Sequence, residues 1–202
     1  MSKRKIIFAT KNKGKIKEIN AVLGETYEIV SMEDAGIDID VVENGSTFEE
    51  NALIKATEIM KLSNEIVLAD DSGLEIDYLN KEPGVHSARY MGKDTSYDIK
   101  NKKILDIMKN VPDDKRTARF VCCIAAALPE PYNKTLTVRG TIEGIIGYDI
   151  QGENGFGYDP IFYLPDRKCT TAELSMKDKN EISHRGKALR LMKAELEKII
   201  GE

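Results

Sequence analysis

The chain has 202 residues, of which 41% are hydrophobic and 32% are charged, so it is long enough to bury a sizeable core. Thirty basic residues against 34 acidic residues give a net charge of −4. This balance argues against a surface that wraps nucleic acid, but it allows a small anion in a local basic pocket. We therefore expect a single domain over residues 1–202, built as one body or two intimate lobes, with a small-molecule partner and no nucleic-acid polymer.

The three cysteines, Cys122, Cys123 and Cys169, form no C-x-x-C pair, which disfavours both a disulfide framework and a zinc site. No segment approaches the roughly 20 apolar residues that a membrane span needs. The apolar stretch at 6–9 is too short for the core of a secretory signal. We expect a soluble, cytoplasmic protein with reduced, buried thiols and no membrane contact.

Strand and helix periodicities alternate along the chain. The predicted strands cover residues 5–9, 27–31, 66–69, 74–78, 120–128 and 136–146, with 66–69 and 74–78 joined as a hairpin. The predicted helices cover 16–23, begin at a capping-box pattern at 46–49, carry apolar residues at 99–108 and run over 185–200. The pattern predicts a mixed α/β fold whose polar motifs lie in the loops that leave strands.

The pair Asp70-Asp71 directly follows the apolar run 66–68 and precedes Ser72-Gly73. Two adjacent carboxylates are costly to hold together unless a cation or a proton shares them. Because consecutive strand residues face opposite sides of a sheet, one aspartate would point into a cleft while the other caps a turn or supports the first. From these residues alone, a metal-assisted site and an ordinary Asp-Asp-Ser-Gly turn both stay open.

The loop 10–15 stands between the first predicted strand and the first predicted helix. Backbone N–H groups at a helix N-terminus and a lysine ammonium suit phosphate oxygens, whereas a basic surface turn is the alternative interpretation. The loop is not a Walker A motif, because Ala9 and Ile16 stand where that motif requires glycine and serine or threonine. Its residues are Thr10, Lys11, Asn12, Lys13, Gly14 and Lys15.

Glu50 lies in the first turn of the second predicted helix, where the helix dipole favours a carboxylate. A purely structural role is therefore one interpretation. The other is that the Asp71 segment folds beside this helix start, so that Glu50 and an aspartate bracket one hard cation. Magnesium suits a site of a few carboxylates, waters and substrate phosphates.

Two further segments carry polar groups. In 152–160, closely spaced glycines allow a backbone to approach a ligand, and Phe156 would present its ring to a planar base; a bulged hairpin is the alternative. Before the last predicted helix, Lys179, His184 and Arg185 combine cationic donors with a helix cap.

Six motifs stand in this order: Thr10-Lys11-Asn12-Lys13-Gly14-Lys15, Thr47-Phe48-Glu49-Glu50-Asn51-Ala52, Ala69-Asp70-Asp71-Ser72-Gly73-Leu74, Pro83-Gly84-Val85-His86-Ser87-Ala88-Arg89-Tyr90, Gly155-Phe156-Gly157-Tyr158-Asp159-Pro160 and Ser183-His184-Arg185-Gly186. Together they resemble the inosine triphosphate pyrophosphatase family over nearly the whole chain. The resemblance implies a cytoplasmic, magnesium-dependent, homodimeric enzyme that converts ITP, dITP and XTP to the monophosphate and pyrophosphate. It also implies an α/β fold, a long bent mixed β-sheet flanked by helices, with two lobes and an active-site cleft.

The resemblance also implies a role for each matching residue. The loop 10–15, with Thr10, Asn12 and Lys15 foremost, meets the triphosphate, while Glu50 and Asp71 hold Mg²⁺ and Asp71 is the candidate general base. The implied substrate contacts are Ser72 at the nucleotide, Phe156, Gly157, Tyr158 and Asp159 at the base, and Lys179, His184 and Arg185 around the pocket.

Selectivity for a 6-oxo purine requires protein donors at O6, because the amino group of ATP would face those donors with donors of its own. His184, Arg185 and the backbone N–H groups of the glycine loop are the candidates. His86 stands where relatives are expected to carry tyrosine, so no phenol role is transferred, and Arg89 either contacts phosphate or braces its loop. Two rival functions are a pyrophosphatase for other standard or modified triphosphates and a non-catalytic nucleotide-binding module.

Overall fold

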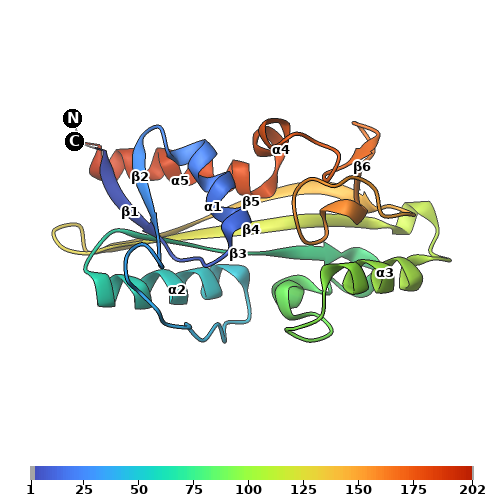
Figure 1. Ribbon diagram of the computed structural model, residues 1–202, viewed down its shortest axis with the longest axis horizontal. Coiled ribbons are helices and arrows are strands. Elements are labelled where there is room, and N and C mark those ends of the chain that lie inside the picture. Colours follow the sequence, from blue (N-terminus) through green and yellow to red (C-terminus); the bar gives the residue numbers. More distant parts are fainter. Residues whose placement is uncertain (1–2, 202) are drawn as a thin grey trace. The chain divides into compact units, whose positions relative to one another are not determined.

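The computed structural model describes residues 3–201 (Figure 1). Strands, α-helices and short 3-10 helices (η) follow one another along the chain. They are β1 Arg4–Phe8, α1 Lys13–Leu23, β2 Tyr27–Ser31, α2 Phe48–Ser63, β3 Val67–Ile76, η1 Asp77–Leu79, η2 Gly84–Arg89, α3 Tyr97–Met108, η3 Asp113–Lys115, β4 Thr117–Leu128, β5 Lys134–Ile146, η4 Asp159–Ile161, β6 Phe162–Leu164, β7 Cys169–Thr170, α4 Met176–Ile182 and α5 His184–Ile200.

The strands form one seven-stranded sheet in the order β2-β1-β3-β4-β5-β6-β7. β1 pairs in parallel with β2 and with β3, where Ile7 stands opposite Val67. β5 and β6, and β6 and β7, pair antiparallel, with Ile145 opposite Tyr163. The predicted mixed sheet flanked by helices is therefore confirmed, while the cleft that the resemblance implies stays a prediction.

The described residues divide into two compact units. The first unit holds residues 3–71, 122–140 and 184–201, and the second holds 72–121 and 141–183. β3, β4 and β5 each contribute residues to both units. The first unit therefore contains β1, β2, α1, α2 and α5, and the second contains α3, α4, β6 and β7.

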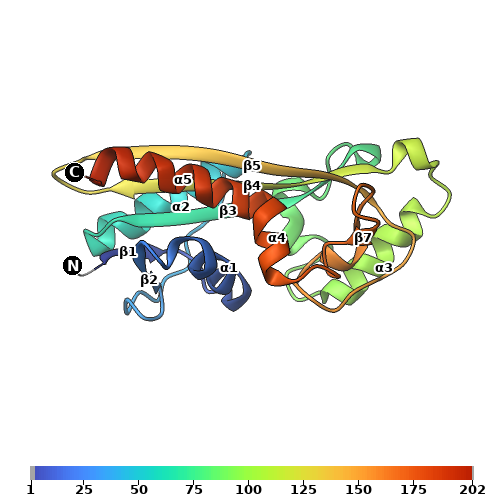
Figure 2. The same cartoon turned by 90° about the horizontal axis from the view of Figure 1, so that it is seen from above.

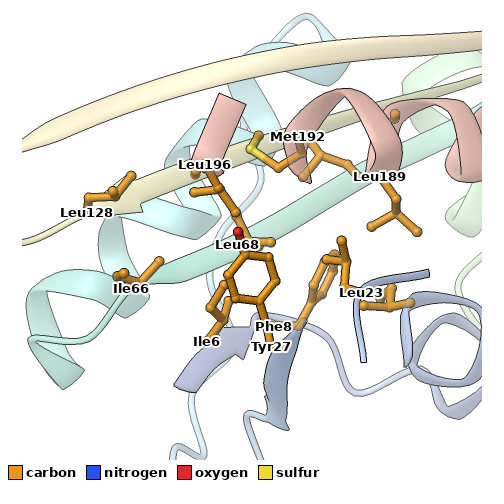
Figure 3. Packing of buried hydrophobic residues seen from close by; sticks show 14 of the residues in the cluster. Ile6, Phe8, Leu23, Tyr27, Ile66, Leu68, Leu128, Leu189, Met192 and Leu196 are labelled. Atoms are coloured by element: carbon orange, nitrogen blue, oxygen red, sulfur yellow. The ribbon is translucent and has the colours of Figure 1, made fainter. Parts of the chain in front are cut away.

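In the first unit, alternate residues of the strands feed two separate cores. Phe8 and Leu68 pack with α1 and α5 in one core, together with Tyr27 of β2. Figure 3 shows these side chains converging with Leu189 of α5. Their chain neighbours point the other way, and Val67 packs with α2 in the second core. The period of two in the strands is what places α1 and α5 on one face of this part of the sheet and α2 on the other.

In the second unit, α3 covers a core that its apolar face predicts. Ile104 and Met108 pack against β3 and β4 residues there. Arg116 lies buried beneath the end of α3, and its guanidinium donates to the carbonyls of Met108 and Ile146. The bond to Met108 satisfies a carbonyl at the C-terminus of α3 that has no partner within the helix, and the bond to Ile146 ties the end of β5 to the same guanidinium.

The predicted hairpin between 66–69 and 74–78 is wrong, and so is the Asp-Asp-Ser-Gly turn. β3 runs without interruption through Asp70, Asp71, Ser72 and Gly73 to Ile76. Turn-forming residues remain extended here because the carboxylate of Asp70 is buried and paired with cations, as described below, and because the apolar side chains on both sides of the four residues belong to cores. Leu74 N–H donates to the Ser87 hydroxyl oxygen at 2.9 Å.

α2 begins within the predicted capping-box pattern at 46–49, with its cap at the second residue of that pattern. Thr47 is the N-cap of α2, and its hydroxyl accepts a hydrogen bond from Glu50 N–H at 3.1 Å. β6, β7 and α4 were not predicted, because three, two and seven residues are too few to establish a period. Among residues 3–201, no helix is long and apolar enough to cross a membrane.

Leu68→Ala tests the core of the first unit. Leu68 is fully buried among side chains of β1, α1 and α5, so we expect the free energy of unfolding to fall by about 2–5 kcal/mol. Urea unfolding of the variant measures the loss. Leu62→Ala is the matched control, because Leu62 is 63% exposed, and its change should stay within about 0.5 kcal/mol. Equal effects at the two positions would contradict this packing.

Candidate active site

The two adjacent aspartates of β3 face opposite sides of the sheet in the first unit. Asp70 points toward α1 and α5, where Lys15 and Arg185 bind it. Asp71 points toward α2, where Asn51 binds it. The alternation predicted from the sequence is thus confirmed, and it gives each carboxylate its own set of partners.

Asp70 is completely buried and is surrounded by cations. Lys15 Nζ lies 3.0 Å from Oδ1 and 2.9 Å from Oδ2, and Arg185 Nη2 lies 3.2 Å from Oδ2. Burial alone raises the pKa of Asp70, but the charges of Lys15, Arg185 and Lys55 outweigh burial and hold the pKa well below its usual range. These partners keep Asp70 ionised, and a carboxylate with so low a pKa is a weak proton acceptor.

Arg185 joins α5 to α1 through a second buried carboxylate. Its Nη1 donates to Glu18 of α1 while its Nε and Nη2 face Asp70. Both Arg185 and Glu18 are buried. The nucleotide contact predicted for Arg185 stays a prediction, but the structure gives its guanidinium two carboxylate partners inside the first unit. Separating α1 from α5 would leave a buried charge without its partner, which is strongly unfavourable. The pair therefore fixes how α1 and α5 meet.

Asp71 is 9% exposed, and a buried amide holds its carboxylate. Asn51 Nδ2 donates to Asp71 Oδ2 at 3.0 Å, and Gly45 N–H in turn donates to Asn51 Oδ1 at 2.8 Å. Burial raises the pKa of Asp71 to about 6, with the negative charge of Glu43 adding to the rise, although Asn51 and Lys55 favour the ionised form. A carboxylate with this pKa accepts protons far better than Asp70 does, because its conjugate acid is weaker.

Lys55 and Glu43 belong to this site, and the sequence reasoning missed both. Lys55 Nζ donates to the Asp70 carbonyl oxygen at 3.0 Å and lies 2.8 Å from Glu43 Oε1. Burial lowers the pKa of Lys55, but the charges of Asp70 and Glu43 raise it overall. The sequence did contain a hint of the position of Lys55. It follows Asn51 by four residues and so lies on the same face of α2.

Glu50 caps the start of α2. It is exposed, and its Oε2 accepts hydrogen bonds from Ser46 N–H at 2.7 Å and Ser46 O–H at 2.8 Å. These bonds, led by the one from the Ser46 backbone, lower the pKa of Glu50. Within the described part of the chain, no group of three or more His, Cys, Asp or Glu side chains is gathered as a metal site. The predicted Glu50 and Asp71 metal pair stays a prediction.

The loop 10–15 leads into α1 as predicted. Asn12 is the N-cap, and its Oδ1 accepts hydrogen bonds from Gly14 N–H at 2.9 Å and Lys15 N–H at 3.2 Å. Asn12 N–H donates to the Thr10 hydroxyl oxygen at 3.2 Å. Two of the amides expected to receive phosphate therefore already have an acceptor, so an anion here would meet side chains or displace the Asn12 carbonyl oxygen.

Lys11 and Lys13 of the same loop lie at the surface. Lys11 Nζ is 3.0 Å from Asp38 and 3.2 Å from Asp40, and these hydrogen bonds raise its pKa. Beside the loop is a cavity of about 320 Å³ lined by groups of both charges. The lining residues are Thr10, Lys11, Lys13, Ile16, Lys17, Ser31, Glu33 and Asp34.

In the second unit, the glycine loop 155–158 is built around a buried ion pair. Lys179 Nζ lies 2.6 Å from Asp159 Oδ2, which also accepts from Phe156 N–H at 2.8 Å. The Lys179 ammonium stands 5.0 Å from the centre of the Phe156 ring, a cation-π distance. A Cβ at Gly155 would lie 2.2 Å from Asp159 Oδ2, so only glycine fits there.

Tyr158 and Ser72 are the other predicted contacts in this unit. Tyr158 is buried, and its hydroxyl donates to the Ser87 carbonyl oxygen at 2.8 Å. Ser72 is half-buried on β3. Of the loop residues, Phe156 and Gly157 are partly accessible, whereas Tyr158 and Asp159 are internal supports.

His184 opens α5 in the first unit. A Cβ at Gly140 of β5 would lie 2.3 Å from the His184 carbonyl oxygen and 2.7 Å from Ala188 N. Glycine at 140 is therefore required for the start of α5 to lie against β5, where Figure 2 shows the two elements side by side. His184 itself is buried, and its predicted contact with the nucleotide stays a prediction.

Comparison with known proteins gives one consistent result. The sequence model of the Ham1 family matches residues 6–195. A "dITP/XTP pyrophosphatase" of Exiguobacterium sibiricum is 48% identical, covering 98% of this chain and 100% of the relative, and one of Clostridium perfringens is 46% identical, covering 98% and 99%. The solved Ham1 protein of Staphylococcus aureus has a TM-score of 0.85 and is 42% identical, covering 96% of this chain and 99% of that one. The resemblance inferred from the six motifs is confirmed.

Asp71→Asn is expected to stabilise the folded chain above neutral pH. The folded pKa of about 6 exceeds the ordinary value of 3.8, so ionised Asp71 destabilises the fold as pH rises through 6, and the penalty is absent below about pH 4. Asparagine keeps an acceptor for Asn51 without the charge. We expect a gain of about 1–3 kcal/mol at pH 8 and almost none at pH 4.

Urea unfolding at the two pH values, with a chelator present, measures this difference. Asp166→Asn is the control, since Asp166 is exposed in a turn, and it should change little at either pH. A loss of stability in Asp71→Asn at pH 8 would show that the buried carboxylate is needed for folding.

Proposed function

The chain belongs to the Ham1 family, and on this premise we propose that it hydrolyses noncanonical purine nucleoside triphosphates to the monophosphate and pyrophosphate. The substrates are dITP, XTP and ITP, and their removal cleans the nucleotide pool. The names of the relatives that match over nearly their full length support this substrate class. The observation that carries the proposal is that Asp70 and Asp71 face opposite sides of β3 and have different partners. Asp71 is therefore left suited to accept a proton, although Asp70 beside it in the chain is not.

Asp71 is the proposed general base. Hydrolysis to a monophosphate and pyrophosphate requires water to attack the α-phosphorus, and that water must lose a proton. With a pKa of about 6, Asp71 is ionised near neutral pH, yet basic enough to share the proton in the transition state. The Asn51 amide at 3.0 Å holds the carboxylate in one orientation, and the attack on phosphorus forms no bond to the protein.

Lysines of the first unit are proposed to face the phosphates. The ammonium group of Lys15 on α1 is held 2.9 Å from the Asp70 carboxylate, and that of Lys55 on α2 is held 2.8 Å from the Glu43 carboxylate. Their ammonium groups offset the negative charge that builds up on the departing pyrophosphate. Thr10 and Asn12 lie at the N-terminus of α1 beside Lys15. Because the three residues belong to one sequence motif, we propose that all three contact the phosphates.

Magnesium is the proposed cofactor, and the residues fit it. Mg²⁺ is usually held by one or two carboxylates together with waters and substrate phosphates, so it needs no cluster of three protein ligands. Asp71 would hold it with Glu50, as the family resemblance implies, or with Glu43, whose charge already acts on Asp71. Each of these two glutamates would exchange a present partner for the metal, Ser46 for Glu50 and Lys55 for Glu43. When bound, the metal supplies positive charge at the phosphates.

The glycine loop of the second unit is proposed to bind the purine. Phe156 and Gly157 are its accessible members, and a ring and a bare backbone suit a planar base. The buried Asp159 and Lys179 pair keeps the loop in place. Ser72 and His184 are proposed as additional nucleotide contacts. A homodimeric state and a cytoplasmic location are proposals that rest on the family resemblance.

One assay tests the function. Pyrophosphate release is measured with Mg²⁺ for ITP, XTP, dITP, dUTP, GTP and ATP, and we expect kcat/KM for the first three to exceed that for ATP by at least about 100-fold. Asp71→Asn should lower kcat by about 100-fold or more while remaining folded, because the water loses its proton acceptor. Asp166→Asn, the exposed control, should retain activity.

Other patterns of activity would point to the rival functions. Preference for dUTP would indicate a pyrimidine enzyme, and binding of ITP without hydrolysis would indicate a nucleotide-binding module. Turnover of Asp71→Asn near that of the unaltered chain would remove Asp71 from the proposed role.

A further inference from the structure

Asn101 of α3 is bonded to the glycine loop within the second unit. Its Nδ2 donates to the Gly157 carbonyl oxygen at 3.0 Å, and the residue is only 2% exposed. That carbonyl lies in the peptide plane that joins Gly157 to Tyr158, so the bond fixes the orientation of the plane. Gly157 has φ of 72°, a backbone conformation that glycine adopts without strain.

The two preceding peptide planes of the loop are both bonded to Asp159, one through the Phe156 carbonyl and one through Phe156 N–H. The Phe156 carbonyl accepts from Asp159 N–H at 3.4 Å, and Phe156 N–H donates to the Asp159 carboxylate at 2.8 Å. Gly157 N–H shares a plane with the Phe156 carbonyl, and nothing among residues 3–201 accepts a hydrogen bond from it. The loop thus presents one backbone donor, in the plane whose carbonyl is bound by Asp159 N–H and next to the plane that Asn101 holds.

Packing alone does not favour asparagine at position 101. Its Oδ1 is buried and has no hydrogen-bond partner within residues 3–201. A buried amide that is only half satisfied is less favourable than an apolar side chain of the same size. A need for the Nδ2 donor at Gly157 accounts for the residue.

The same turn of α3 also holds other parts of this region. Lys100 Nζ donates to the Ala88 carbonyl at 2.7 Å, and Tyr158 O–H donates to the Ser87 carbonyl at 2.8 Å. The rings of Tyr97 and Tyr158 meet edge to face with centroids 5.2 Å apart. The loop and η2 are therefore both braced against α3, and Asn101 is the member that contacts the loop backbone nearest the free donor.

We infer that Asn101 is a positioning residue for base selection, which holds Gly157 N–H where it donates to O6 of a 6-oxo purine. The 6-amino group of adenine would place a donor against that donor, so the amide selects against ATP. The inference rests on the proposed function, because it assumes that the glycine loop binds the purine. It assigns the selectivity to the loop backbone and makes that selectivity depend on α3.

Asn101→Leu tests the inference, since leucine is similar in size and lacks the donor. We expect KM for ITP to rise about tenfold with kcat within about twofold, because a bond that orients the loop is lost and the reacting groups are untouched. The ratio of kcat/KM for ITP to that for ATP should fall by a similar factor. Inorganic tripolyphosphate, which has no base, should inhibit the variant and the unaltered chain equally.

Lys102→Leu is the matched control, because Lys102 is exposed on the same helix, and its kinetic constants should be unchanged. Asn101→Ala provides a second test should the leucine variant fail to fold. An unchanged ratio of kcat/KM for ITP to kcat/KM for ATP in a folded variant would overturn the inference. So would a loss of tripolyphosphate inhibition as large as the rise in KM for ITP. Failure of the proposed function is distinguishable, since the unaltered chain would then not prefer ITP at all.

Discussion

The alternation of side chains along β3 is the constraint on which the first unit depends. It sends Asp70 to the face covered by α1 and α5 and Asp71 to the face covered by α2. Had the segment turned after Ala69, as its composition suggests, both carboxylates would have shared one environment and repelled each other. The extended backbone instead places Asp70 among cations and Asp71 beside the Asn51 amide. The pKa values of two chemically identical groups are therefore shifted in opposite directions.

The buried anion Asp70 and the cations around it support each other. Asp70 remains ionised because Lys15 and Arg185 surround it, and these cations in turn need Asp70 to be buried at all. Arg185 extends the network to Glu18, so the start of α5 and the middle of α1 are held to the same strand. In the second unit a buried pair, Asp159 with Lys179, similarly holds the glycine loop. Ion pairs with little solvent contact hold loops and helix ends in place in both units.

The sequence predicted those structural features that are determined by residues close together in the chain. The start of α2 within the pattern 46–49 and the opposite orientation of the paired aspartates were predicted correctly, because capping and strand alternation involve few residues. The cap itself lies at the second residue of that pattern, Thr47. The hairpin after Ala69 was wrong, because burial overrides turn preference there. The parts played by Glu18 and Lys55 were missed, since each depends on a partner far away in the sequence, and only their spacing from Lys15 and Asn51 along a helix gave a hint.

The most direct test of the account is a pH titration of the Asp70 and Asp71 carboxyl groups by carbon-13 NMR. The chain is labelled at aspartate, kept free of divalent cations, and assigned with Asp71→Asn. We expect Asp71 to titrate near pH 6 and Asp70 to stay ionised throughout the range in which the chain is folded. Titration of Asp70 near neutral pH, with Asp71 at its ordinary value, would contradict the separation of roles along β3.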